Sequence, residues 1–190
     1  YRLTFNGSWT HNSDGITGDG LTVANTKFDV GSSATTNDFH MSIYNRTDLN
    51  ENKYDMGVYV APNDMGLITR GFDATGRFYG TLGSNTQYVS TSNSDARGHY
   101  IANRNPATST VTDGYKNGTS VYSLTQTHTK PTGKNLGIGA SNRGAGGSEE
   151  GTSANKNYAL SSFGEGFTDA EAANFYTAVQ AFQTELSRNV

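Results

Sequence analysis

The clearest pattern in this sequence is an alternation of apolar and polar side chains, which indicates strands with one buried face. The first run places three apolar side chains on one face: Phe39, Met41 and Ile43. The opposite face of that run is polar: His40, Ser42, Tyr44 and Arg46. After a polar loop around residues 50–53, a second run has an apolar face of Met56, Val58 and Val60 and an opposite face of Asp55, Gly57 and Tyr59. Both runs predict half-buried antiparallel strands.

Further strand signals recur every eight to twelve residues, the spacing of a β-sandwich. They cover residues 66–72, 77–82, 87–91, 99–104, 111–116, 119–124 and 136–140. Asn117-Gly118 separates two of these runs, and both residues can adopt the positive φ that a two-residue type I′ hairpin requires. The sequence therefore predicts an all-β protein with a tight turn at this dipeptide.

The pattern changes to helical spacing near the C-terminus. Thr168 can cap a helix, Glu171 completes a capping box, and Phe167 can pack against Ala172 as a hydrophobic staple. The apolar stripe of this helix is Ala172, Phe175, Tyr176, Val179, Phe182 and Leu186. We expect a helix over residues 168–187 that packs on the sandwich through this stripe, with an oligomer contact as the alternative.

The length of 190 residues corresponds to one domain, with strands over residues 1–164 and the helix after them. Gly, Asn, Ser and Thr make up 85 of the 190 residues, and 11 tyrosines supply core volume. This composition suits many strands joined by tight turns. It is also typical of secreted or displayed proteins.

Charge and cysteine content exclude several kinds of protein. The net charge of −3 argues against nucleic-acid binding, and the absence of cysteine excludes disulfides and thiolate metal sites. No run of 18 apolar residues predicts a membrane span. The chain begins with Tyr1, so we expect a piece of a longer or processed polypeptide.

The arrangement of acids and histidines does not predict catalysis or a metal site. The predicted strands contain no acid-x-acid pair of the kind that would place two carboxylates for glycoside hydrolysis. The histidines are His11, His40, His99 and His128, and none has zinc-ligand spacing. Asp14 and Asp19 lie in the glycine-rich segment of residues 12–20, where a plain turn is favoured and calcium is the open alternative.

Several segments in order resemble the concanavalin A-like lectin/glucanase superfamily, in its laminin-G-like branch. The segments are the alternating strand pair, Asp113-Gly-Tyr-Lys-Asn-Gly118, Leu136-Gly-Ile-Gly-Ala-Ser-Asn142 and Tyr158-Ala-Leu-Ser-Ser-Phe163. The tail over residues 167–188 is similar to the C-terminal helix of such domains in phage structural proteins and in environmental bacterial and viral proteins. The resemblance implies a jelly-roll sandwich of two antiparallel sheets, one of them concave and often carrying a glycan site.

The sequence departs from the enzymes of that superfamily. Its glucanases carry Glu-x-Asp-x-x-Glu on one strand, and no glutamate here is followed two residues later by aspartate. The metal pattern of legume lectins is also unmatched. We therefore expect no enzymatic activity, no cofactor and no metal.

Two functions are compatible with these features. The first is a non-catalytic carbohydrate-binding or receptor-binding domain of a phage tail fibre or a surface adhesin, with a cell-surface glycan as partner. The second is a structural or decoration domain of a virion with no glycan ligand. Either places the protein on a virion or outside the cell, as a homo-oligomer or part of a larger assembly.

The expected glycan-binding residues are those on the polar faces of the strands, where they would form a solvent-facing row on a concave sheet. Tyrosine and arginine side chains there are directional donors for sugar hydroxyls and carboxylates. The set is His40, Tyr44, Arg46, Tyr59, Arg70 and Arg104, with Trp9 as a stacking platform. The alternative is a tyrosine–arginine face that only stabilises the sheet. The loops at 14–20 and 143–151 are the next candidates.

Overall fold

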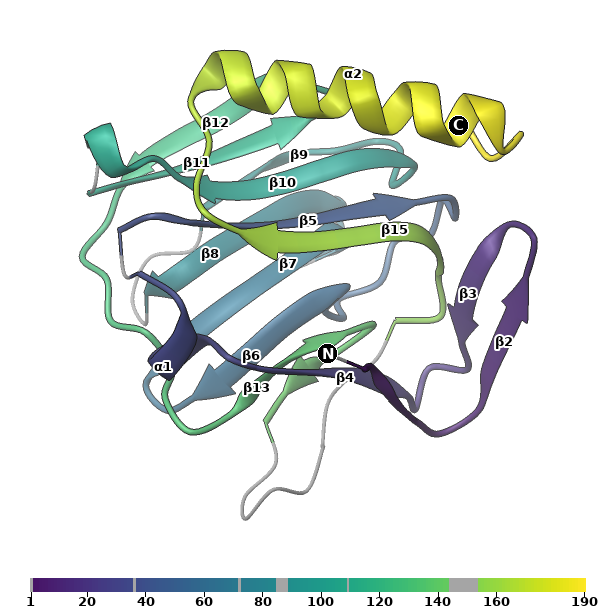
Figure 1. The fold of residues 1–190 in the computed structure, drawn as a ribbon, viewed down its shortest axis with the longest axis horizontal. Helices are drawn as coiled ribbons and strands as arrows, with labels where there is room; N and C mark the ends of the chain where they lie inside the picture. The colour runs from purple at the N-terminus through teal and green to yellow at the C-terminus, as the bar shows by residue number, and fades with distance from the viewer. Residues whose placement is uncertain (1, 36, 72, 85–88, 109, 144–153) are drawn as a thin grey trace.

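The computed structural model describes residues 2–35, 37–71, 73–84, 89–108, 110–143 and 154–190, and shows two sheets packed face to face (Figure 1). Within these residues the first sheet has eight strands in the order β1-β4-β13-β6-β7-β8-β9, with β14 paired parallel to β6. We call it the β6 sheet. Its strands are β1 (Thr4–Asn6), β4 (Val23–Asp29), β6 (Met56–Val60), β7 (Asn63–Gly71), β8 (Arg77–Ser84), β9 (Val89–Ser92), β13 (Asn135–Ile138) and β14 (Ser141–Asn142).

The second sheet, which we call the β5 sheet, has seven strands in the described residues, in the order β12-β11-β10-β5-β15-β3-β2. All of its pairings are antiparallel. Its strands are β2 (Trp9–Asn12), β3 (Gly15–Gly18), β5 (Phe39–Asn45), β10 (Gly98–Arg104), β11 (Val111–Lys116), β12 (Thr119–Thr125) and β15 (Asn157–Gly164). The described residues also form three helical segments: α1 (Val30–Ser33), a 3-10 turn η1 (Pro106–Thr108) and α2 (Asp169–Glu185).

The core lies between the two sheets and is built by the apolar faces of the alternating runs. Phe39, Met41 and Ile43 of β5 face Met56 and Val58 of β6 across it. Other strands add buried side chains to the same cluster, namely Met65, Leu67, Phe78, Leu82, Tyr100, Leu136, Ile138 and Tyr158. The all-β sandwich with one C-terminal helix, expected from the sequence, is confirmed.

The predicted hairpin at Asn117-Gly118 is also confirmed. It joins β11 to β12, and both residues have positive φ, 51° and 75°. The alternating runs at 39–45 and 56–60 are strands, as expected, but they belong to opposite sheets. Their polar faces therefore point away from each other, and the expectation that Tyr44 and Tyr59 share one face is wrong.

Helix α2 begins where the capping box predicts. The Thr168 side chain accepts from the backbone N–H of Glu171, and the Glu171 carboxylate accepts from the backbone N–H of Thr168 (2.8 Å). Phe167 and Ala172 pack together in a second apolar cluster with Ile101 and Tyr115. The helix therefore lies over the outer face of the β5 sheet, where Figure 1 shows it running across the top of the molecule.

The register of this helix differs from the expected stripe. Its buried residues are Ala172, Val179 and Gln183, whereas Phe182 is 51% exposed and Leu186 is 41% exposed. Phe182 lies about 100° around the helix from Gln183, since an α-helix has 3.6 residues per turn. The expectation that Phe182 and Leu186 are buried against the sandwich is therefore wrong. No helix of the described residues is long and apolar enough to cross a membrane.

Candidate functional site

Two of the expected glycan-binding residues lie beneath helix α2. Tyr44 is fully buried: its hydroxyl donates to Gln180 Oε1 (3.1 Å) and accepts from the backbone N–H of Val190 (3.0 Å). His40 is 6% exposed, and its ring stacks on Phe167 with centroids 4.2 Å apart. Because α2 covers this face of the β5 sheet, the expectation that these side chains face solvent is wrong.

Three more of the expected residues lie elsewhere. Arg104 is 1% exposed at the end of β10, and burial lowers the pKa of its guanidinium to about 9. Arg70 and Tyr59 belong to the β6 sheet, where Arg70 pairs with Asp48 (2.8 Å) and Tyr59 lies beneath the guanidinium of Arg143 (5.2 Å). The expected single row of glycan-binding residues therefore does not form. Of the loop candidate at 143–151, residues 144–151 lie outside the described residues.

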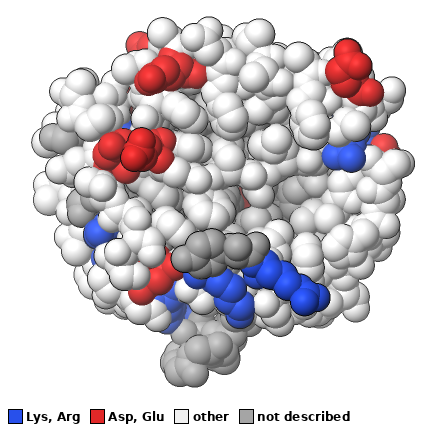
Figure 2. Space-filling view, viewed as in Figure 1, with Lys and Arg blue, Asp and Glu red and all other residues white. Residues whose placement is uncertain are grey.

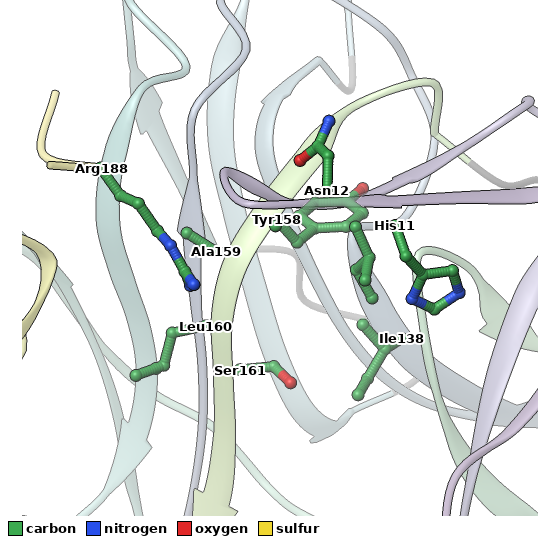
Figure 3. Close-up of a pocket in the computed structure, with 10 residues that line it drawn as sticks. His11, Asn12, Ile138, Tyr158, Ala159, Leu160, Ser161 and Arg188 are labelled. Atoms are coloured by element: carbon green, nitrogen blue, oxygen red, sulfur yellow. The ribbon is translucent and has the colours of Figure 1, made fainter. Parts of the chain in front are cut away.

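The structure instead forms a cleft of about 310 Å³ beside β15, which we call the β15 cleft (Figure 3). Its lining comes from the β2–β3 hairpin, from β13 and β15, and from the residues after α2. The lining residues are His11, Asn12, Gly15, Ile16, Ile138, Tyr158, Ala159, Leu160, Ser161 and Arg188. In Figure 3, Arg188 and His11 approach from opposite sides, with the β15 residues between them.

The β2–β3 hairpin forms one wall of the cleft because it pairs only briefly with β15. That ladder consists of Asn157 with Thr17 and Tyr158 with Ile16. Beyond it the edge of β15 is open toward the hairpin, and an unpaired edge presents backbone donors and acceptors. Gly15 has φ 137° and lies against the Tyr158 carbonyl, where a Cβ would collide with that oxygen. A glycine at this position lets the hairpin approach β15.

The end of α2 places Arg188 on the opposite wall. The backbone N–H of Arg188 donates to the Gln183 carbonyl (2.8 Å), and that of Ser187 donates to the Thr184 carbonyl (2.9 Å). With Ser187 at φ 56°, this is a Schellman motif, which reverses the chain direction at a helix end. Arg46 fixes the turn, because its Nε donates to the Arg188 carbonyl (2.8 Å) and its guanidinium lies 3.4 Å from Asp14.

The β15 cleft combines an apolar wall with uncommitted polar groups. Ile16, Ile138 and Leu160 supply the apolar surface. Asn12 Oδ1 accepts from the backbone N–H of Asp14 (2.9 Å), which leaves its amide NH₂ available. The buried Nε of Arg188 has no hydrogen-bond partner in the part of the chain that the structure describes.

Sequence reasoning missed most of this site. His11, Asn12, Ser161 and Arg188 share no motif or spacing, so no local signal pointed to them. Of the expected residues, Arg46 holds the Arg188 turn at the margin of the cleft. Trp9, in β2, packs against the core cluster and lies beside Phe5, with ring centroids 5.6 Å apart. Gly15 and Ile16 fall within the loop at 14–20 that the sequence offered as a second candidate.

A second cleft, of about 470 Å³, lies at the start of α2 and is lined by acidic side chains instead of a basic one. Asp113 and Asp169 line it together with Ser123 and Thr168. Burial, and to a lesser extent the neighbouring Asp169, raises the pKa of Asp113. Asp169 accepts a hydrogen bond from the Tyr115 hydroxyl (2.6 Å) and lies in the first turn of α2, where an acid stabilises the helix dipole.

The calcium alternative at residues 12–20 gains no support from the geometry. Asp14 faces Arg46, and Asp19 Oδ1 accepts from the backbone N–H of Leu21 (2.9 Å). Across the described ranges, no group of three or more acidic or histidine side chains is placed to hold a metal ion.

The sequence matches no protein-family model and no curated protein. Solved structures match by fold. Domain 4 of AbnA, an extracellular arabinanase from Geobacillus stearothermophilus solved with arabinotriose, has a TM-score of 0.60 at 11% identity over 92% of this chain and 87% of its own. Botulinum neurotoxin type C, described as entering cells through two ganglioside molecules, has a TM-score of 0.59 at 10% identity over 94% of this chain.

A sialidase of Trypanosoma rangeli has a TM-score of 0.56 at 10% identity over 99% of this chain. The chain spans 46% of the neurotoxin structure and 30% of the sialidase structure. At these identities the comparisons establish the fold alone, a β-sandwich of two antiparallel sheets with one C-terminal helix. A fold of this kind does not by itself define a function, which depends on the site it carries.

Proposed function

We propose that this chain is a non-catalytic glycan-binding domain and that the β15 cleft is its binding site. The observation that carries the proposal is the convergence of His11, Asn12 and Arg188 on one cleft that also has an apolar wall. Small-molecule sites combine an apolar lining with a few directed polar groups, and their volumes begin near 300 Å³. A sugar ring presents both an apolar C–H surface and hydroxyls. Domain 4 of AbnA, a sandwich of similar fold, was solved with arabinotriose.

The chemistry of the cleft favours binding without hydrolysis. Most glycosidases need two carboxyl groups on either side of the scissile bond. None of the described residues that line the β15 cleft is acidic. The pair formed by Asp113 and Asp169 lines the other cleft, where Asp169 is already engaged by Tyr115 and the helix start.

The proposed biological setting is the receptor-binding part of a phage tail fibre or of a surface adhesin, outside the cell or on a virion. Most of the face in Figure 2 is uncharged, which suits a hydroxyl-rich partner better than nucleic acid. The exposed Phe182 and Leu186 on α2 offer a contact for a homo-oligomer or a larger assembly. A decoration domain without a glycan ligand is the competing function.

A glycan array tests the proposal, with His11→Ala as the variant of the site and His128→Ala as its matched control. His11 lines the cleft, whereas His128 does not. We expect the parent to bind at least one glycan, His11→Ala to weaken that binding about tenfold, and His128→Ala to leave it unchanged. Binding to no glycan by a folded parent would support the decoration domain instead. Equal binding by the parent and His11→Ala would place the site elsewhere.

A further inference from the structure

The β15 cleft carries positive charge without any negative charge to balance it. Of the side chains that line it, Arg188 is positive and none is negative. This contrasts with the whole chain, whose net charge is −3, and with the cleft at the start of α2, which carries two carboxylates and no basic residue among the residues that line it. The positive charge in the β15 cleft is therefore a local feature.

No protein carboxylate neutralises Arg188 in the described residues. The nearby Asp14 pairs with Arg46 instead of Arg188. Arg46 in turn contacts Arg188 only at its backbone carbonyl. The Arg188 Nε is buried and has no partner in the same described ranges. A buried donor on a charged group is costly when it is unpaired. A ligand that supplies an oxyanion would satisfy it.

The site around Arg188 is also held in place. The Schellman motif fixes the backbone on one side, and the hydrogen bond from Arg46 fixes its carbonyl on the other. These bonds fix the backbone from which the Arg188 side chain enters the cleft. A guanidinium presents two parallel N–H groups, the geometry that binds a carboxylate. His11 and the Asn12 amide lie on the hairpin wall across the cleft and can bind the hydroxyls of the same sugar.

We propose that the β15 cleft selects acidic glycans, with Arg188 binding the carboxylate of a uronic-acid-type sugar. This inference rests on the proposed glycan-binding function and narrows its ligand to one class. The competing role for Arg188 is structural, because a cation beyond the C-terminus of a helix stabilises the helix dipole. The two roles differ in their effect on ligand choice.

The test compares an oligosaccharide of galacturonic acid with its methyl ester by titration calorimetry. We expect the acid to bind at least tenfold more tightly than the ester, and this preference to shrink in high salt, since salt screens charge pairs. Arg188→Gln should remove the preference, so that the acid and the ester bind to the variant with equal affinity. The control Arg97→Gln removes an exposed arginine that pairs with Asp95 outside the cleft, and it should leave the preference intact.

Each outcome is decisive. Equal affinity of the parent for acid and ester would overturn the acidic preference and leave glycan binding standing. An Arg188→Gln variant that lowers the melting temperature but keeps the acid preference would assign Arg188 the structural role. A sulfated oligosaccharide of matched length that binds more tightly than the galacturonate would overturn the carboxylate assignment. Failure of every glycan to bind would overturn the proposed function itself.

Discussion

At the scale of single residues, a buried ion pair ties the two sheets together. Asp55, just before β6, and Lys156, just before β15, are both 0% exposed and lie 3.1 Å apart. The same carboxylate accepts from the Tyr158 hydroxyl (2.7 Å), and Lys156 also donates to Thr69 Oγ1 (3.0 Å). Burial and the nearby Asp55 raise the pKa of Tyr158 well above its usual value. Asp55, Lys156 and Tyr158 each have an ion-pair or hydrogen-bond partner within this network.

We predict that Asp55→Ala destabilises the protein by about 3–5 kcal/mol, because it leaves the Lys156 ammonium buried without its partner. Urea unfolding followed by tyrosine and tryptophan fluorescence measures the change. Asp95→Ala is the control, since it removes a partly exposed ion pair with Arg97 and should change stability little. An Asp55→Ala midpoint equal to that of the parent would mean that the network does not hold the sheets.

At the scale of elements, α2 acts as a third layer over the β5 sheet. The side chain of Phe175 in α2 packs between the helix and the sheet. Its ring centroid lies 5.1 Å from that of Phe167, 5.3 Å from that of His99 and 6.0 Å from that of His40. Phe182, one of the residues that the sequence assigned to the same stripe, is half exposed. The two phenylalanines of α2 therefore differ: Phe175 packs on the β5 sheet, whereas Phe182 is about half exposed to solvent.

This difference predicts unequal effects of two matched substitutions. Phe175→Ala should cost about 3 kcal/mol, the lower end of the range for a packed phenylalanine, because Phe175 is only partly buried. Phe182→Ala should stay within about 0.5 kcal/mol of the parent, as surface substitutions usually do. Thermal unfolding measures both. A larger loss for Phe182→Ala than for Phe175→Ala would mean that the exposed side chain is covered, for example in an oligomer.

At the scale of the whole molecule, the layer under α2 makes stability depend on pH. Burial, with a smaller contribution from His40, lowers the pKa of His99 to about 3. Burial also lowers the pKa of His40. The ring of His99 lies between Phe175 and Tyr176, and its nitrogens have no hydrogen-bond partner among the described residues. Protonation of this ring is therefore unfavourable in the folded state.

We predict that stability falls as the pH drops from about 6.5 toward 3. In that window an unfolded histidine binds a proton and the folded His99 does not, so each pH unit costs up to about 1.4 kcal/mol. Urea unfolding between pH 7 and pH 4 measures the slope. His99→Leu removes the buried histidine and should reduce the slope of stability against pH. The control His11→Ala replaces an exposed histidine and should leave that slope as it is in the parent. Equal slopes for the parent and His99→Leu would show that other groups cause the loss.

The sequence by itself determined the features that depend on neighbouring residues. Alternation in β5 and β6 gave the strands and their apolar faces, because side chains on a strand point to opposite sides in turn. Asn117-Gly118 gave the hairpin, because few residues adopt positive φ. Thr168 and Glu171 gave the start of α2, because a capping box acts within one turn. These signals are local, so the fold class followed from them.

The tertiary structure alone decided what covers each face and where the cleft lies. The outer side of β5 reads as polar, yet all seven of its residues are buried, since α2 packs on that side as a third layer. Alternation specifies that a strand has two faces and does not specify which layer covers the second one. Likewise, the β15 cleft joins His11, Ser161 and Arg188, which are separated by 150 and 27 positions in the chain and meet only through sheet order and the turn after α2.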